Sequence, residues 1–117
     1  KNEPHALVSI HVNSFYQSRY HGAQTFYSLD NEESKQLATI IQEELIRVLG
    51  NDNKRQPQGK DDIFIIKGLD IPTVLIECGF LSNPQEEQKL NDPQYQQKVA
   101  WSIYVGLQRY FITSFQE

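Results

Sequence analysis

The sequence of 117 residues contains a single cysteine, Cys78. One cysteine excludes an internal disulfide bond and any metal site built from paired cysteines. The sequence also has no cluster of lysine and arginine, because the acidic and basic residues behind its formal charge of -4 at pH 7 are mixed along the chain. A protein that neutralises nucleic-acid phosphates needs such a cluster, so we expect no nucleic-acid partner.

Long apolar runs and several common motifs are missing as well. No stretch approaches the roughly 20 apolar residues of a membrane-spanning helix, so we expect no membrane span in this chain. The first residues, KNEPH, lack the charged and apolar regions of a signal peptide, and we expect any targeting segment to lie outside this chain. The phosphate-binding patterns GxGxxG and GxxxxGK(S/T) and the serine-hydrolase pattern GxSxG are absent, which removes support for common cofactor sites and for a serine nucleophile.

What is present is typical of one globular domain. Hydrophobic residues make up 38% and charged residues 22% of the chain, as in ordinary soluble proteins. A chain of this length buries roughly two thirds of the surface that it exposes when unfolded. We therefore expect a single core.

The stretch LVSIHVNS at residues 7–14 alternates with a period of two, which predicts a strand. One face is apolar throughout, and it is formed by Ala6, Val8, Ile10 and Val12. The other face turns polar toward its C-terminal end, where His11 and Asn13 lie. A lone histidine in this position is most often a residue at the edge of the core, satisfied by a backbone carbonyl or by water. The alternative is a metal ligand.

Further segments carry the signals of strands and helices. Strands are predicted from β-branched, aromatic and apolar residues at 23–28, 63–67 and 73–77. Helices are predicted after capping residues at 30–50, at 82–90 and from Asp92 onward. Residues 51–62 have no hydrophobic period and predict an exposed loop. Strands that are separated by helices predict an α/β fold with helices packed on the faces of a sheet.

Glu77 ends the apolar run TVLIE, where a desolvated carboxylate needs a compensating partner. That partner is either a helix N-terminus or an arginine, or it is a metal or electrophile in a functional site. Open α/β sheets place ligands at the C-terminal ends of their strands, and both His11 and Glu77 lie at such ends. The two residues thus point to one edge of the sheet.

Of the three histidines, only His11 is a credible metal ligand. His5 lies six residues earlier on the same strand face, about 20 Å away at about 3.3 Å per residue, which is too far for one coordination sphere. His21 lies beside Gly22 in the loop that follows Asn13, and we expect it to be solvated.

Four segments resemble, in order and spacing, the later part of the zinc-dependent N-acetylmuramoyl-L-alanine amidases, which are peptidoglycan hydrolases. The segments are SIHVNS, GAQTFY, IPTVLIECGFLSNPQEEQKL and IYVGLQRYF. GAQTFY and the last segment are most similar to the spore-cortex amidases of endospore-forming bacteria. The resemblance implies that residues 1–113 are the C-terminal part of a single amidase catalytic domain, with residues 114–117 as a tail. It also implies a twisted, largely parallel sheet flanked by helices on both faces.

The resemblance implies a site as well. His11, in the family's SIH(A/V)N motif, is expected to bind zinc (Zn²⁺), and Glu77, in its VLIE(x)GFLSN motif, is expected to be the catalytic carboxylate. Zinc would activate a water and polarise the carbonyl of the lactyl group of N-acetylmuramic acid, while Glu77 would pass the water's proton to the departing L-alanine amine. We expect peptidoglycan as the partner and an extracytoplasmic place of action, in the cell wall or the spore cortex during sporulation or germination.

Two motifs of the family, a GHGG-like histidine and a later helical glutamate, are absent. In the family they complete the zinc site, so we expect residues 1–117 alone to bind zinc poorly and to be inactive. Two alternatives stay open. One is a non-catalytic peptidoglycan-binding module with an amidase-like fold, and the other is a cysteine hydrolase that uses Cys78 with His11. The apolar run around Cys78 is more typical of an inert buried thiol.

Asn13 and the loop that follows it would border the substrate cleft of such an amidase. Charge alone suggests that Arg55 and Lys60 lie near carboxylates of the peptidoglycan stem peptide. A solvated loop is the stronger interpretation of both residues.

Overall fold

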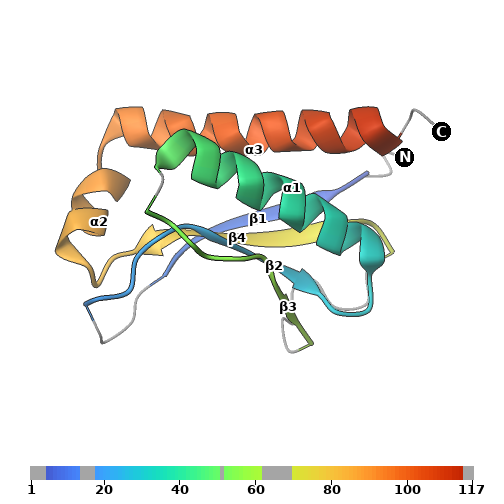
Figure 1. Ribbon diagram of the computed structural model, residues 1–117, viewed down its shortest axis with the longest axis horizontal. Helices are drawn as coiled ribbons and strands as arrows, with labels where there is room; N and C mark the ends of the chain where they lie inside the picture. Colours follow the sequence, from blue (N-terminus) through green and yellow to red (C-terminus); the bar gives the residue numbers. More distant parts are fainter. Residues whose placement is uncertain (1–4, 14–17, 51, 62–69, 115–117) are drawn as a thin grey trace.

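The computed structural model describes residues 5–13, 18–50, 52–61 and 70–114. Along these residues the order of elements is β1 (Leu7–Asn13), β2 (Gln24–Ser28), α1 (Glu32–Leu49), β3 (Gln58–Lys60), β4 (Thr73–Phe80), α2 (Pro84–Leu90) and α3 (Pro93–Ser114) (Figure 1). The described strands form one sheet in the order β1-β4-β2-β3. Its β1–β4 and β2–β3 pairs are parallel, and its β2–β4 pair is antiparallel. The predicted α/β fold, with a largely parallel sheet flanked by helices, is confirmed.

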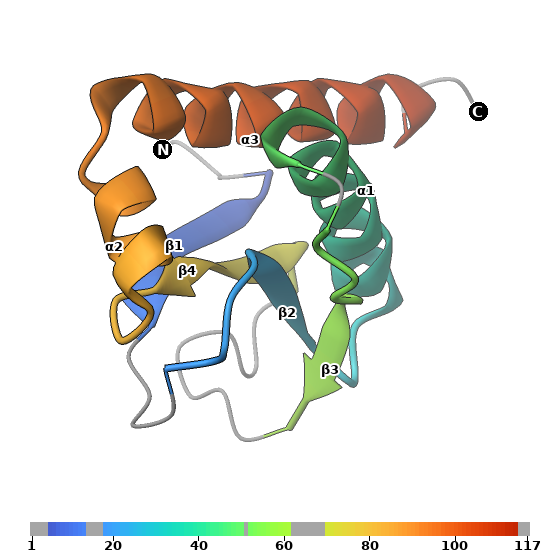
Figure 2. The ribbon, with the colours of Figure 1, turned by 60° about the vertical axis from the view of Figure 1, so that its left-hand side comes forward.

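The long helices α1 and α3 lie side by side over one face of the sheet, and α2 lies at the end where β4 finishes (Figures 1 and 2). We expected helices on both faces, but within the described residues both long helices cover the same face. The opposite face of β4 carries Leu75 and Glu77, which alternate with the buried residues Val74 and Ile76. None of the described helices has the length and apolar character needed to cross a membrane.

Each helix begins where a side chain satisfies the free backbone N–H groups of its first turn. Asp30 and Asn31 were the two candidates to cap α1, and Asn31 does so, because its Oδ1 accepts a hydrogen bond from Ser34 N at 3.0 Å. Asn83 caps α2 in the same way, with Pro84 in the first helical position. Asp92 Oδ1 accepts from Gln94 N at 3.0 Å at the start of α3.

The core lies between the sheet and the two long helices. Its apolar members come from α1, β4 and α3, and they include Leu37, Ala38, Ile41, Leu45, Val74, Ile76, Val99, Ile103 and Tyr110. Buried polar groups between α1 and β2 are satisfied: Gln42 Oε1 accepts from Thr25 N at 2.8 Å, and Thr25 Oγ1 donates to Ala38 O at 3.0 Å. Such bonds hold β2 against α1 without leaving an unpaired polar group in the core.

Two strands differ from the prediction, and one predicted strand cannot be compared with the structure. β3 lies within the predicted loop 51–62, because its three residues pair through the backbone with β2 and show no apolar alternation. β4 continues to Phe80, three residues beyond the predicted end of that strand. The strand predicted at 63–67 lies outside the described residues.

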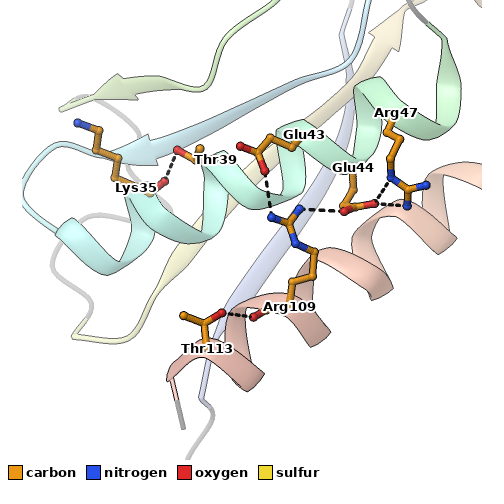
Figure 3. A network of polar contacts seen from close by, with 7 residues as sticks. All are labelled: Lys35, Thr39, Glu43, Glu44, Arg47, Arg109 and Thr113. Atoms are coloured by element: carbon orange, nitrogen blue, oxygen red, sulfur yellow. Dashed lines mark hydrogen bonds and ion pairs between the residues drawn. The ribbon is translucent and has the colours of Figure 1, made fainter. Parts of the chain in front are cut away.

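A network of charged side chains joins α1 to α3 (Figure 3). Arg109 donates from Nη1 to Glu44 Oε2 at 2.8 Å and from Nη2 to Glu43 Oε1 at 3.1 Å. Arg47 also binds Glu44, from one turn further along α1. Burial alone would raise the pKa of Glu44, which is only 5% exposed, but the hydrogen bonds and charges of Arg47 and Arg109 outweigh burial and lower that pKa. Glu44 is thus a buried carboxylate that depends on two arginines.

We predict that Arg109→Ala lowers the free energy of unfolding by about 1–3 kcal/mol, because it leaves the buried Glu44 with one partner. Urea unfolding of the intact protein, followed by circular dichroism, measures this change. The matched control is Glu43→Gln, which breaks only the exposed arm of the network and is expected to cost less than about 1 kcal/mol. Equal costs for the two variants would contradict the prediction.

Candidate active site

The pairing of β1 with β4 places His11 directly opposite Glu77. The two strands run in register from Leu7 opposite Thr73 to His11 opposite Glu77. Because paired residues of neighbouring strands point to the same side of a sheet, the imidazole and the carboxylate share one face. That face is the one turned away from α1 and α3. The structure thus brings together the two residues that the sequence singled out.

The carboxylate of Glu77 is held partly out of water without a partner of its own. Its Oε1 atom is buried and makes no hydrogen bond within the described residues. Burial raises the pKa of Glu77, and the charges of the nearby His11 and Lys60 oppose that rise only in part. A carboxylate in such a place is a stronger base than one in water, which suits it to accept a proton.

The His11 side chain is exposed and is oriented by a neighbour on its own strand. Ser9 Oγ lies 2.7 Å from His11 Nε2, and the two residues share a strand face because they are two positions apart. The partner of the His11 ring among the described residues is this hydroxyl and not a backbone carbonyl, while a water remains a possible partner in the interpretation of His11 as a core-edge residue. His11 is a solvent-accessible imidazole beside a buried carboxylate.

The other two histidines make their contacts with residues other than His11. The His5 ring packs edge-on against Phe111 of α3, with the ring centroids 6.4 Å apart. The carbonyl oxygen of His21 accepts a hydrogen bond from Arg55 Nε at 2.7 Å. Across the described ranges, no three His, Cys, Asp or Glu side chains come together in a way that could hold a metal ion. A zinc ion bound to His11 would therefore need ligands from beyond these residues.

Glu86 was not selected from the sequence. Its side chain joins two segments that flank the site. It is buried, its Oε1 accepts from Phe80 N at 2.9 Å, and its Oε2 accepts from Gly22 N at 3.1 Å. A Cβ atom at Gly79 would lie 2.9 Å from Glu86 Oε1, so the strand end passes close to this carboxylate. No local pattern could have identified this role, because Glu86 accepts from Gly22 N, which is 64 positions away in the sequence.

Arg55 is fixed beside the site, although a solvated loop was expected. Its Nη1 donates to Gln24 Oε1 at 3.0 Å, and its guanidinium carbon lies 4.8 Å from the centre of the Phe80 ring. Gln24 is paired with Glu77 across the β2–β4 ladder, so Arg55 approaches the site from the β2 side. Lys60, the second cation for which charge suggested such a role, is the last residue of β3, and its Nζ lies 5.2 Å from the centre of the Phe26 ring.

Comparison with known proteins identifies the family to which this chain belongs. Residues 1–109 match the family described as N-acetylmuramoyl-L-alanine amidase. The germination-specific N-acetylmuramoyl-L-alanine amidase of Bacillus subtilis is 42% identical over 110 residues, which cover 94% of this chain and 46% of that protein.

Two solved structures have the same fold. The CwlD amidase from Clostridioides difficile, in complex with the GerS lipoprotein, is 52% identical with a TM-score of 0.91, and the match covers 93% of this chain and 55% of that one. The N-acetylmuramoyl-L-alanine amidase from Clostridium difficile 630 is 29% identical with a TM-score of 0.84, over 97% of this chain and 60% of that one. The chain thus spans about half the length of the relatives it matches. It belongs to the N-acetylmuramoyl-L-alanine amidase family.

Proposed function

We propose that this chain forms part of a zinc-dependent amidase that hydrolyses the bond between the lactyl group of N-acetylmuramic acid and the L-alanine of the peptidoglycan stem peptide. The observation that carries the proposal is the buried Oε1 atom of Glu77, which has no partner within the described residues and lies in register with His11. Family membership supports the same chemistry. A buried carboxylate oxygen without a hydrogen-bond partner lowers the stability of the fold. The same burial makes the carboxylate more basic, which is a property of catalytic groups.

His11, Ser9 and Glu77 would have different roles in this reaction. His11 would hold the metal, together with ligands from outside this chain, and Ser9 would orient its ring. When bound, zinc supplies a Lewis acid that polarises a carbonyl oxygen and acidifies water. The Glu77 carboxylate would take a proton from the attacking water as the water oxygen bonds to the lactyl carbonyl carbon. The same carboxyl group would return that proton to the L-alanine nitrogen as the carbon–nitrogen bond breaks, which yields the lactyl carboxylic acid and a free amine, and the acid then loses its proton to water at neutral pH.

The surroundings of Glu77 suit both halves of this proton transfer. Burial raises the pKa of the carboxyl group and makes it a better base, while the charge of Lys60 favours its ionised form. A base must be ionised before the reaction and must hold the proton long enough to deliver it. The opposing effects on Glu77 meet these two needs.

The place of action proposed for the protein is the cell wall or the spore cortex. Peptidoglycan is an extracytoplasmic polymer, and a substrate of that kind requires the enzyme to act outside the membrane. The name of the Bacillus subtilis relative, a germination-specific amidase, supports a role in spores.

A cysteine hydrolase is the alternative that the structure disfavours. Cys78 is 7% exposed and belongs to the core cluster, and it follows Glu77 on β4, so its thiol points to the opposite face of the sheet. Burial, together with the charge of Glu77, raises the pKa of Cys78 to about 11. The thiolate that a cysteine nucleophile requires is therefore scarce at neutral pH and lies away from His11.

We predict that iodoacetamide modifies Cys78 at least about a hundredfold more slowly in the folded protein than in urea at the same pH, because the pKa rises from 9.0 to about 11 and so depletes the thiolate. Mass spectrometry over a time course measures both rates. Cys78→Ala should retain amidase activity within about twofold, since the thiol has no chemical role. Rapid labelling together with inactivation would support the cysteine hydrolase instead.

We predict that Glu77→Gln lowers kcat by about a thousand- to ten-thousand-fold while zinc content stays unchanged, because the amide cannot accept the water's proton. The assay is release of L-alanine-terminated peptides from peptidoglycan by the intact protein, with zinc content and melting temperature measured on the same samples. A variant that cleaves within about tenfold of wild type would remove Glu77 from the mechanism. A zinc-loaded wild type that releases no peptide would favour the non-catalytic peptidoglycan-binding module.

We predict that His11→Ala lowers the zinc affinity of the intact protein by at least about a hundredfold and abolishes most activity, because water does not replace an imidazole ligand without cost. The melting temperature of the zinc-free protein should change little, since the His11 side chain is exposed. Zinc titration with a competing chelator gives the affinity. Ser9→Ala, which removes only the hydroxyl beside the ring, is the matched control and should weaken zinc binding less. Full zinc retention by His11→Ala would mean that His11 is not a ligand.

A further inference from the structure

A hollow of about 370 Å³ lies on the β2 side of the site, between Arg19, Tyr20 and His21 on one wall and residues 52–55 on the other. Three cations, Arg19, Lys54 and Arg55, line it together with a single carboxylate, that of Asp52. Within the described parts of the chain, the ion pairs are those of Arg47 and Arg109 with Glu43 and Glu44. None of the three cations of this hollow therefore forms an ion pair with a described carboxylate, although Asp52 lies in the same hollow.

Arg55 is the cation of the hollow that is held in a fixed position. Its Nε donates to His21 O at 2.7 Å, its Nη1 donates to Gln24 Oε1 at 3.0 Å, and its guanidinium carbon lies 4.8 Å from the centre of the Phe80 ring. A guanidinium has five N–H groups. Two are used in these bonds, so three remain without a partner among the described residues. An arginine that is already ordered loses little side-chain entropy when it binds an anion.

The position of Gln24 relates Arg55 to the proposed catalytic carboxylate. Gln24 lies opposite Glu77 in the antiparallel β2–β4 ladder, so the two side chains share the face of the sheet that also carries His11. The Gln24 amide is held at both ends, since its Nε2 donates to Gln56 O at 2.7 Å while its Oε1 accepts from Arg55. One fixed side chain thus separates the Arg55 guanidinium from Glu77.

We propose that Arg55 binds a carboxylate of the stem peptide on the L-alanine side of the cleaved amide. This role rests on the proposed function. The glycan strand of the substrate consists of N-acetylated sugars whose lactyl carboxyl groups are consumed in the amide bond, so the negative charges of such a substrate lie on the peptide. The planar guanidinium fork matches a carboxylate, which accepts two N–H groups at once. The peptide therefore runs from Glu77 across Gln24 toward Arg55, and the glycan lies on the other side of the site.

The test compares two substrates on the intact, zinc-loaded protein. One is soluble glycan strands with native stem peptides, and the other is the same strands after carbodiimide coupling to ammonia, which converts the carboxylates to amides. Wild type should favour the native strands by about ten- to a hundredfold in kcat/KM, mainly through KM, because a charge-assisted hydrogen bond is lost with the amidated ones. Arg55→Gln should lose that factor on native strands and should cleave amidated strands as wild type does. Arg55→Lys should restore part of the preference.

Lys54→Gln is the matched control, because it removes the same charge from the same hollow without touching Gln24. It should change kcat/KM on native strands by less than about threefold. Zinc content and circular dichroism should be the same for all variants. Equal losses on both substrates for Arg55→Gln would show a structural role, and an equal effect of Lys54→Gln would show general charge attraction; either result overturns the proposal.

The outcomes for the Arg55 role and for the amidase function can be told apart. A wild type that cleaves both substrates equally well overturns the role of Arg55 and leaves the amidase function standing. A wild type that cleaves neither overturns the amidase function and the Arg55 role together. The substrate preference of wild type needs no variant, so the proposal stays open to refutation even if Arg55→Gln does not fold.

Discussion

The candidate site depends on one constraint, which is the register of β1 against β4. Val74 and Ile76 are completely buried under the helices, and this fixes which face of β4 carries Glu77. The parallel ladder then fixes His11 beside it. A slip of one residue would turn Glu77 toward the core and Cys78 toward the site, because side chains alternate with a period of two. The burial of two apolar side chains thus determines the chemistry that the sheet presents on its other face.

The segments around the site are held by polar side chains that reach across the fold. Glu86 binds the backbone at Phe80 and at Gly22, and Arg55 binds the backbone at His21 and the side chain of Gln24. These bonds connect the end of β4, the start of β2 and the loop before β3. Loops that carry function need such attachments to a rigid scaffold, because binding groups must be ordered before the ligand arrives. These three described segments are therefore held in place by the fold before a ligand binds.

Local patterns were sufficient to predict most of the elements. The alternation at residues 7–14 predicted β1, and the capping signals at residues 30–31 and in the segment 82–90 predicted where α1 and α2 begin. β3 escaped prediction because its side chains carry no apolar alternation and its pairing is entirely backbone. The position of Arg55 could not be predicted either, since its bonds join residues 34 and 31 positions apart in the sequence. The adjacency of His11 and Glu77 was predictable because both lie at the C-terminal ends of strands, where open α/β sheets place their ligands. Their roles in zinc binding and proton transfer stay predictions that rest on the family resemblance.

Glu77 differs from two other glutamates of the fold in the hydrogen-bond partners of its carboxylate. Glu44 is buried and bound by two arginines, and Glu86 is buried and bound by two backbone N–H groups. Both obey the rule that a desolvated charge is compensated by its neighbours. Glu77 Oε1 is equally out of contact with water, yet no described residue donates a hydrogen bond to it. Among the described residues, the two buried carboxylates are thus compensated by direct hydrogen bonds, whereas Glu77 Oε1 has only nearby positive charge to oppose the effect of burial. Uncompensated polar groups persist in proteins mainly where a ligand or a reaction uses them, and the position of Glu77 at the C-terminal end of a strand is where such a use is expected.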